Sequence, residues 1–144
     1  NLSTQDIVKI TNLAENYNVS ELIDSCLSKN ENKTVRILNE NSYSLEDCIF
    51  IIRSFLLKSK RLLNLSNEIK DKKSIDKVIT NFKPPIFWKD KEAVKQQILI
   101  WSYENLEKLI CEINEVELLI KKYPNNSINI LSNFIIEQST RANN

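Results

Sequence analysis

Residues that could perform acid–base chemistry are present, but their usual partners are missing. Neighbouring carboxylates occur at Glu46 and Asp47 and again at Glu115 and Glu117. Such a pair acts in catalysis when one carboxyl is desolvated in a cleft, and no metal-ligand pattern lies beside either pair. The chain has no histidine, so imidazole is excluded as a general base or a zinc ligand. We therefore interpret both pairs as solvated helix faces.

Nucleophilic and phosphate-binding chemistry is also disfavoured. Cys26, Cys48 and Cys111 are odd in number, lie far apart in apolar helical stretches and show no CxxC spacing, which predicts buried free thiols in a reducing compartment. A serine or cysteine nucleophile needs an activating base, and none stands out. The chain has no glycine, which excludes a phosphate-binding loop and a nucleophile elbow. The sequence thus predicts no enzymatic activity, no cofactor and no metal.

The charge balance gives no strong attraction to nucleic acid or to membranes. The chain has 20 basic and 19 acidic residues and a net charge of +1. The lysines at positions 70, 72 and 73 are interpreted as a solvated helix end. No signal peptide or membrane-spanning run is recognised, so a cytoplasmic location is expected. The start at Asn1 without a methionine suggests a fragment of a longer protein.

The most distinctive segment is Lys-Pro-Pro-Ile-Phe-Trp-Lys at residues 83–89. One interpretation is a rigid connection between helices, with its two aromatic side chains in the core. The other is a recognition surface, because aromatic residues beside positive charge are typical of interfaces. Physical reasoning favours a core position for Phe87 and leaves Trp88 undecided.

Capped segments with a helical apolar period run along the whole chain, and sustained strand-like alternation is missing. The expected start of the longest early helix combines Ser44 with Asp47 in a capping box. A break is expected at residues 16–18, and a bend is expected at Trp101 and Ser102. The other expected helix starts are at Ser3, Ser20, Asn30, Ser74, Asp90, Ser102 and Ser127.

These segments predict an all-α helical bundle of about seven to nine helices. The inward positions of each helix repeat every three or four residues, and they include large apolar side chains from four of the segments. The candidate core residues are Phe55, Leu62, Trp101, Leu109 and Phe134.

Residues 84–102 resemble a pattern of the bacterial DNA polymerase III clamp-loader delta subunits. The matching residues are Pro-Pro-Ile-Phe-Trp-Lys-Asp-Lys at 84–91, Gln97, and the Trp-Ser pair at 101–102. Glu-Val-Glu-Leu-Leu-Ile-Lys at 115–121 is similar to a later family pattern, and weaker similarities extend over nearly the whole chain. The chain departs from the family at Ile100, where an arginine is expected.

The resemblance implies a clamp-loader collar fold with two parts. Residues 1–17 would be the last helix of the preceding lid domain, and residues 18–144 would form the helical collar, an oligomerisation domain. The collar would pack with the delta prime and gamma/tau subunits into a ring that loads the sliding clamp in DNA replication. The clamp would be bound only through the missing N-terminal domain, DNA contact would be indirect, and polymerisation would belong to the parent holoenzyme.

On this interpretation the candidate subunit interface consists of Phe87, Trp88 and Lys89, with Glu117 and Lys121 as a second set. A stand-alone helical nucleic-acid-binding module remains an alternative, and salt-dependent DNA binding would favour it. An unrelated helical adaptor is a third possibility.

Overall fold

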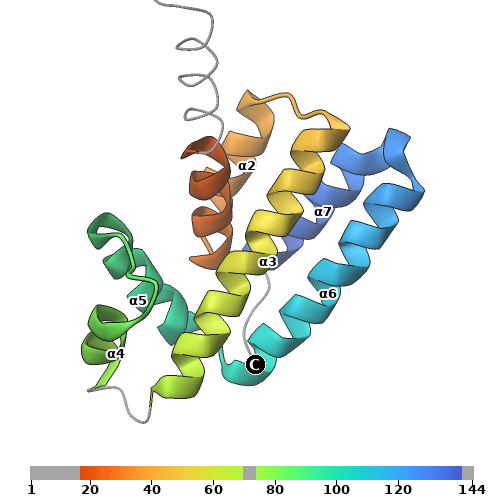
Figure 1. The fold of residues 1–144 in the computed structure, drawn as a ribbon. Helices are drawn as coiled ribbons and strands as arrows, with labels where there is room; N and C mark the ends of the chain where they lie inside the picture. Colours follow the sequence, from red (N-terminus) through yellow and green to blue (C-terminus); the bar gives the residue numbers. More distant parts are fainter. Residues whose placement is uncertain (1–16, 70–73, 141–144) are drawn as a thin grey trace, which may run out of the picture.

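The computed structural model describes residues 17–69 and 74–140 (Figure 1). Within these residues there are seven α-helices and no strand, which confirms the predicted all-α bundle. The first described helix covers residues 17–27. The others are α2 (Glu31–Glu40), α3 (Leu45–Glu68), α4 (Ile75–Asn81), α5 (Lys91–Ile100), α6 (Tyr103–Lys122) and α7 (Ser127–Thr140), with 3-10 turns η2 (Trp88–Asp90) and η3 (Pro124–Asn126).

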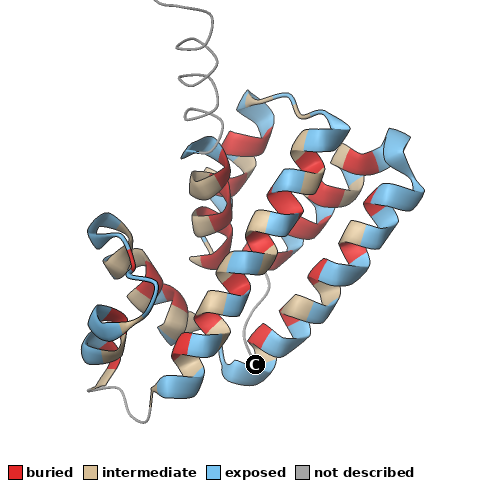
Figure 2. Cartoon of the chain, in the orientation of Figure 1, coloured by how far each residue is buried: buried red, intermediate tan, exposed pale blue. Residues whose placement is uncertain are grey.

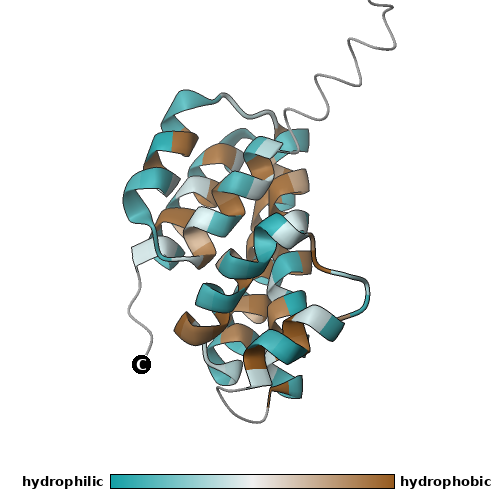
Figure 3. Ribbon diagram, turned by 90° about the vertical axis from the view of Figure 1, so that its left-hand side faces the viewer, coloured by the Kyte–Doolittle hydropathy of each residue, from teal (hydrophilic) through white to brown (hydrophobic). Residues whose placement is uncertain are grey.

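The helices form a bundle with a smaller hairpin attached to its side (Figure 1). The two longest helices, α3 and α6, pack side by side and run antiparallel, and α7 packs against both. The hairpin consists of α4 and α5, which contact each other and α3. Many buried residues lie on the faces that the helices turn toward one another (Figure 2), and apolar residues are spread over all the described helices (Figure 3).

Local capping interactions define several helix starts as predicted. The Ser44 hydroxyl accepts a hydrogen bond from the Asp47 amide, and the Asp47 carboxylate accepts one from the Ser44 amide, which completes the capping box of α3. Asn30 caps α2 through its side chain. The bend between α5 and α6 is confirmed, because Trp101 is extended and Ser102 caps α6.

The start of the first described helix differs from the prediction. Tyr17 and Asn18 are helical, so these two residues form no break. Ser20 lies inside the helix and is not its cap; its hydroxyl accepts a hydrogen bond from Lys58 Nζ at 2.8 Å. The predicted cap at Ser3 and most of the predicted lid helix, residues 1–17, lie outside the described residues.

All five candidate core residues are buried. Phe55, Leu62 and Leu109 are almost completely shielded from solvent, and Phe134 packs against Phe55 with 5.9 Å between their ring centroids. Trp101 is 4% exposed, and its indole N–H donates to the Leu27 carbonyl at 2.8 Å. The core therefore joins side chains from α3, α6 and α7 with the residue that links α5 to α6.

The first described helix ends in a Schellman motif built without glycine. The Lys29 amide donates to the Cys26 carbonyl, and the Asn30 amide donates to the Ser25 carbonyl. Lys29 occupies the left-handed position with a φ of 61°, where glycine is usual. Its Nζ reaches the Gln138 carbonyl at 2.6 Å and lies 4.0 Å from the Trp101 ring centroid. These side-chain contacts offset the strain of a lysine in this conformation.

A pair of substitutions separates backbone strain at Lys29 from the side-chain contacts. Both Lys29→Gly and Lys29→Ala remove the contacts with Gln138 and Trp101. Only glycine relieves the left-handed backbone, so Lys29→Gly is expected to be more stable than Lys29→Ala by about 1 kcal/mol. Urea denaturation of the two variants measures this difference. Alanine being the more stable of the two would contradict the left-handed assignment.

Each helix among residues 17–69 and 74–140 is either too short or too polar to cross a lipid bilayer.

Candidate interaction surface

The connection between α4 and α5 places two aromatic side chains on the outside of the molecule. Pro84 and Pro85 lack the amide hydrogen that a helix needs, and α4 has already ended at Asn81. The 3-10 turn η2 follows, where the Asp90 amide donates to the Phe87 carbonyl at 2.9 Å and leads into α5. In this short connection Phe87 is 57% exposed and Trp88 is 69% exposed.

This exposure corrects the expectation that Phe87 lies in the core. Ile86 takes the inward position instead and is 5% exposed. The interpretation with both aromatic side chains in the core is wrong, because of the three residues after the prolines only Ile86 points inward. We call Phe87, Trp88 and Lys89 the aromatic surface.

The three residues of the aromatic surface contact one another. The ring centroids of Phe87 and Trp88 are 5.9 Å apart and the ring planes are tilted by 51°. Lys89 Nζ lies 5.4 Å from the Trp88 centroid, a cation–π arrangement. In the described ranges neither Lys83 nor Lys89 forms an ion pair. The surface therefore presents apolar area beside a lysine, Lys89, that forms no ion pair among the described residues.

Glu117 and Lys121, the second candidate set, lie elsewhere on the molecule. They belong to the C-terminal half of α6, across the bundle from the α4–α5 hairpin (Figure 1). Lys121 Nζ and Arg53 Nε each lie 3.2 Å from an oxygen of the Glu117 carboxylate. Glu117 therefore links α6 to α3, and the structure does not bring this set together with the aromatic surface.

The charge of Glu117 is stabilised by this arrangement. Burial alone would raise the pKa of Glu117, but hydrogen bonds and attraction from Lys121 and Arg53 outweigh it and lower the pKa below the ordinary 4.5. Because the native pKa is depressed, the pairs stabilise the fold above the ordinary pKa. That contribution is lost as the pH falls through the native pKa.

Glu117→Gln is expected to lower the free energy of unfolding by about 0.5 kcal/mol near neutral pH, since solvent screens partly exposed pairs. At acid pH the native carboxyl is itself protonated, so the variant and the unmodified chain should converge. Urea titrations of both proteins at a series of pH values from about 7 down to about 2 measure this. A stability difference that persists unchanged in acid would contradict the ion-pair account.

Other apolar side chains are exposed on the long helices. Phe50 and Leu57 lie seven residues apart on the outer side of α3, and Leu118 lies on α6. Leu119 is exposed as well, because the buried stripe of α6 follows Leu109, Ile113, Val116 and Ile120 and leaves it at the edge. The i, i+7 spacing of Phe50 and Leu57 was a signal that sequence reasoning did not use.

The three cysteines are free thiols that differ in their exposure. Cys26 and Cys48 are buried free thiols as predicted, whereas Cys111 is exposed, because it lies on the outer face of α6. Burial raises the pKa of the Cys26 thiol to about 12, and its Sγ donates to the Ile135 carbonyl at 3.3 Å. No cluster of potential metal ligands occurs among the residues described.

Comparison with known proteins gives no assignment. The chain matches no protein-family model, and neither a curated protein nor a solved structure is found to be similar to it. Any assignment of function therefore depends on the resemblance carried by residues 84–102 and on the geometry described above.

Proposed function

We propose that this chain is the C-terminal scaffolding domain, or collar, of a bacterial clamp-loader delta subunit. The observation that carries the proposal is the aromatic surface, where Phe87 and Trp88 are exposed beside Lys89. The same residues lie within the segment that carries the family resemblance. An exposed pair of large aromatic side chains is typical of an interface with another protein.

The chain would act mechanically and not as an enzyme. Its packed bundle would hold delta at its place in a ring with the delta prime and gamma/tau subunits in the cytoplasm. Motions driven by ATP in other domains could then reach the sliding clamp, which another part of delta would bind. Affinity would come from apolar side chains such as Trp88, and charged residues at the rim would set the choice of neighbour.

Co-purification tests this function. The chain should be retained on immobilised collar regions of its own delta prime and gamma/tau subunits. It should not be retained on the sliding clamp alone, because the clamp-binding domain would lie in another part of delta. Retention on the clamp but on neither collar would contradict the proposal.

The geometry of the aromatic surface also supports a second candidate, binding of single-stranded nucleic acid. The exposed Trp88 ring could stack on a base, and Lys89 beside it could contact a phosphate. Fluorescence anisotropy with a labelled single strand tests this candidate. Binding that weakens steeply with salt and is lost in Trp88→Ala would favour it, and no binding at low salt would exclude it.

A further inference from the structure

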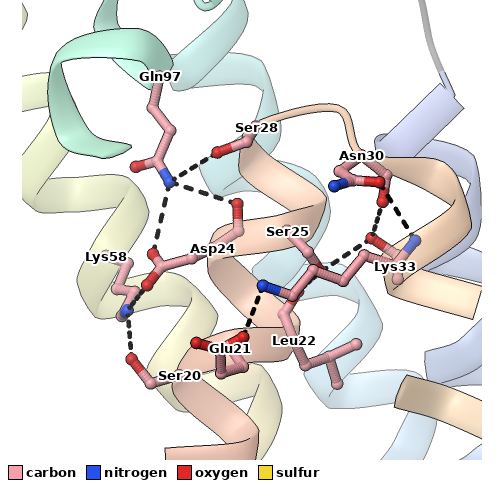
Figure 4. Close-up of polar contacts among 11 residues, drawn as sticks. Ser20, Glu21, Leu22, Asp24, Ser25, Ser28, Asn30, Lys33, Lys58 and Gln97 are labelled. Carbon is pink, nitrogen blue, oxygen red and sulfur yellow. Dashed lines mark hydrogen bonds and ion pairs between the residues drawn. The ribbon is translucent and has the colours of Figure 1, made fainter. Parts of the chain in front are cut away.

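A polar cluster joins the first described helix to α3 and α5 (Figure 4). The Asp24 carboxylate accepts a hydrogen bond from Lys58 Nζ of α3 at 2.9 Å, and the same nitrogen donates to the Ser20 hydroxyl. From the other side, Gln97 of α5 points its amide nitrogen at Asp24 and Ser28. Three helices that are distant in sequence therefore meet around Asp24.

Gln97 is the most enclosed member of this cluster, with 1% of its surface exposed. The two N–H groups of its Nε2 are shared among three acceptors: the Asp24 carbonyl at 3.3 Å, the Asp24 carboxylate at 3.4 Å and the Ser28 hydroxyl at 3.2 Å. Burying an amide lowers stability unless the amide is hydrogen-bonded. These acceptors therefore favour the observed position of α5 over shifted positions in which the hydrogen bonds would be broken.

Trp101 adds a second attachment one helical turn further along the chain. Its indole N–H donates to the Leu27 carbonyl in the last turn of the first described helix. Carbonyls at the end of a helix lack intrahelical partners, so this bond satisfies a group that would otherwise need water. Gln97 and Trp101 thus attach α5 to the C-terminal end of the first described helix at two points.

These two attachments add directional hydrogen bonds to the apolar anchoring of the hairpin, which includes the buried Ile86 and the partly buried Val78, Phe82, Ile98 and Ile100. Within α5 the buried residues are Val94 and Gln97, and within α4 they are Ile75 and Ile79. The aromatic surface lies just before α5, whose first residue, Lys91, is about 9 Å from Gln97 along the helix at the rise of an α-helix. A change in the angle of α5 would therefore move Trp88 relative to the rest of the bundle.

We infer that Gln97, together with Trp101, is a positioning residue that fixes the aromatic surface in the orientation its partner requires. The fixing of the hairpin follows from the contacts above, whereas the effect on a partner rests on the proposed function. The substitution Gln97→Met keeps the side-chain length and removes the amide. Gln96→Met is the matched control, because Gln96 is the adjacent residue of α5 and is exposed.

Hydrogen exchange measured by mass spectrometry on the whole chain provides the first readout. In Gln97→Met, amides of residues 75–100 should exchange about tenfold faster, while those in the middle of α3 and α6 keep their rates. Gln96→Met should leave both regions unchanged. Ser28→Ala removes a single acceptor and should loosen the same hairpin by a smaller factor, which covers the case that Gln97→Met folds poorly.

Affinity for the delta prime and gamma/tau collars provides the second readout, and it should fall several-fold in Gln97→Met although Trp88 is intact. Unchanged exchange in the hairpin, or exchange that rises equally throughout the chain, would overturn the inference. A loosened hairpin with unchanged affinity would also overturn it. If the unmodified chain binds no collar, the proposed function fails, and the exchange data still decide whether Gln97 fixes the hairpin.

Discussion

Replacing Trp101 with alanine is expected to lower the free energy of unfolding by about 3–5 kcal/mol, the largest stability change anticipated for this chain. The substitution empties a core site that is 4% exposed and removes the hydrogen bond to the Leu27 carbonyl. It also removes the ring over which Lys29 lies. Urea denaturation followed by circular dichroism measures the change.

Two further variants at tryptophan positions make this result specific. Trp101→Phe keeps much of the apolar volume but leaves the Leu27 carbonyl without the indole donor, so a smaller loss of about 1–3 kcal/mol is expected. Trp88→Ala removes an exposed tryptophan and should change stability by no more than about 0.5 kcal/mol. Equal destabilisation by the alanine substitutions at 88 and 101 would show that the burial assignment is wrong.

Trp88→Ala is expected to weaken binding to the partner collar by at least about 2 kcal/mol, or roughly 30-fold, because exposed tryptophans at interfaces are frequent hot spots. Leu57→Ala is the matched control, since Leu57 and Trp88 are each 69% exposed but lie on different elements. Isothermal titration calorimetry measures the affinity of the partner collar for the unmodified chain, for Trp88→Ala and for Leu57→Ala. Equal affinity for the unmodified chain and Trp88→Ala would remove Trp88 from the interface.

Helix starts could be predicted from the sequence where the capping side chains lie within a few residues of the first turn. The capping box of Ser44 and Asp47, and the cap at Ser102, depend only on side chains three residues from the groups they satisfy. The burial of Trp101 followed from its place on the apolar stripe. In contrast, Ser20 has the right residue type for a cap but lies inside a helix, where its hydroxyl bonds to Lys58.

The aromatic surface was harder to predict because periodicity ends where the chain turns. Within a helix the spacing of apolar residues tells which side faces the core, but the prolines before Ile86 interrupt that spacing. Three consecutive apolar residues follow, and only the three-dimensional turn selects Ile86 for the core and leaves Phe87 and Trp88 outside. Composition alone could not make that choice.

The polar cluster lay beyond local reasoning for a different reason. Asp24, the acceptor of Gln97, is 73 residues away from it in the sequence. The pairing is created by the docking of α5 on the first described helix, which depends on the whole bundle. Similarly, Cys111 and Leu119 fall on apolar-looking stretches of α6, and only the placement of α3 and α7 shows that both remain exposed.

Sedimentation velocity tests the central claim, that this domain is a collar which associates with other collars. The chain is mixed in the micromolar range with collar regions of its delta prime and gamma/tau subunits, and separately with the sliding clamp and with DNA. If the claim holds, the chain forms a faster-sedimenting complex with at least one collar and sediments as a free protein when mixed with the clamp. Separate boundaries with every collar, together with a complex on the clamp or on DNA, would contradict it.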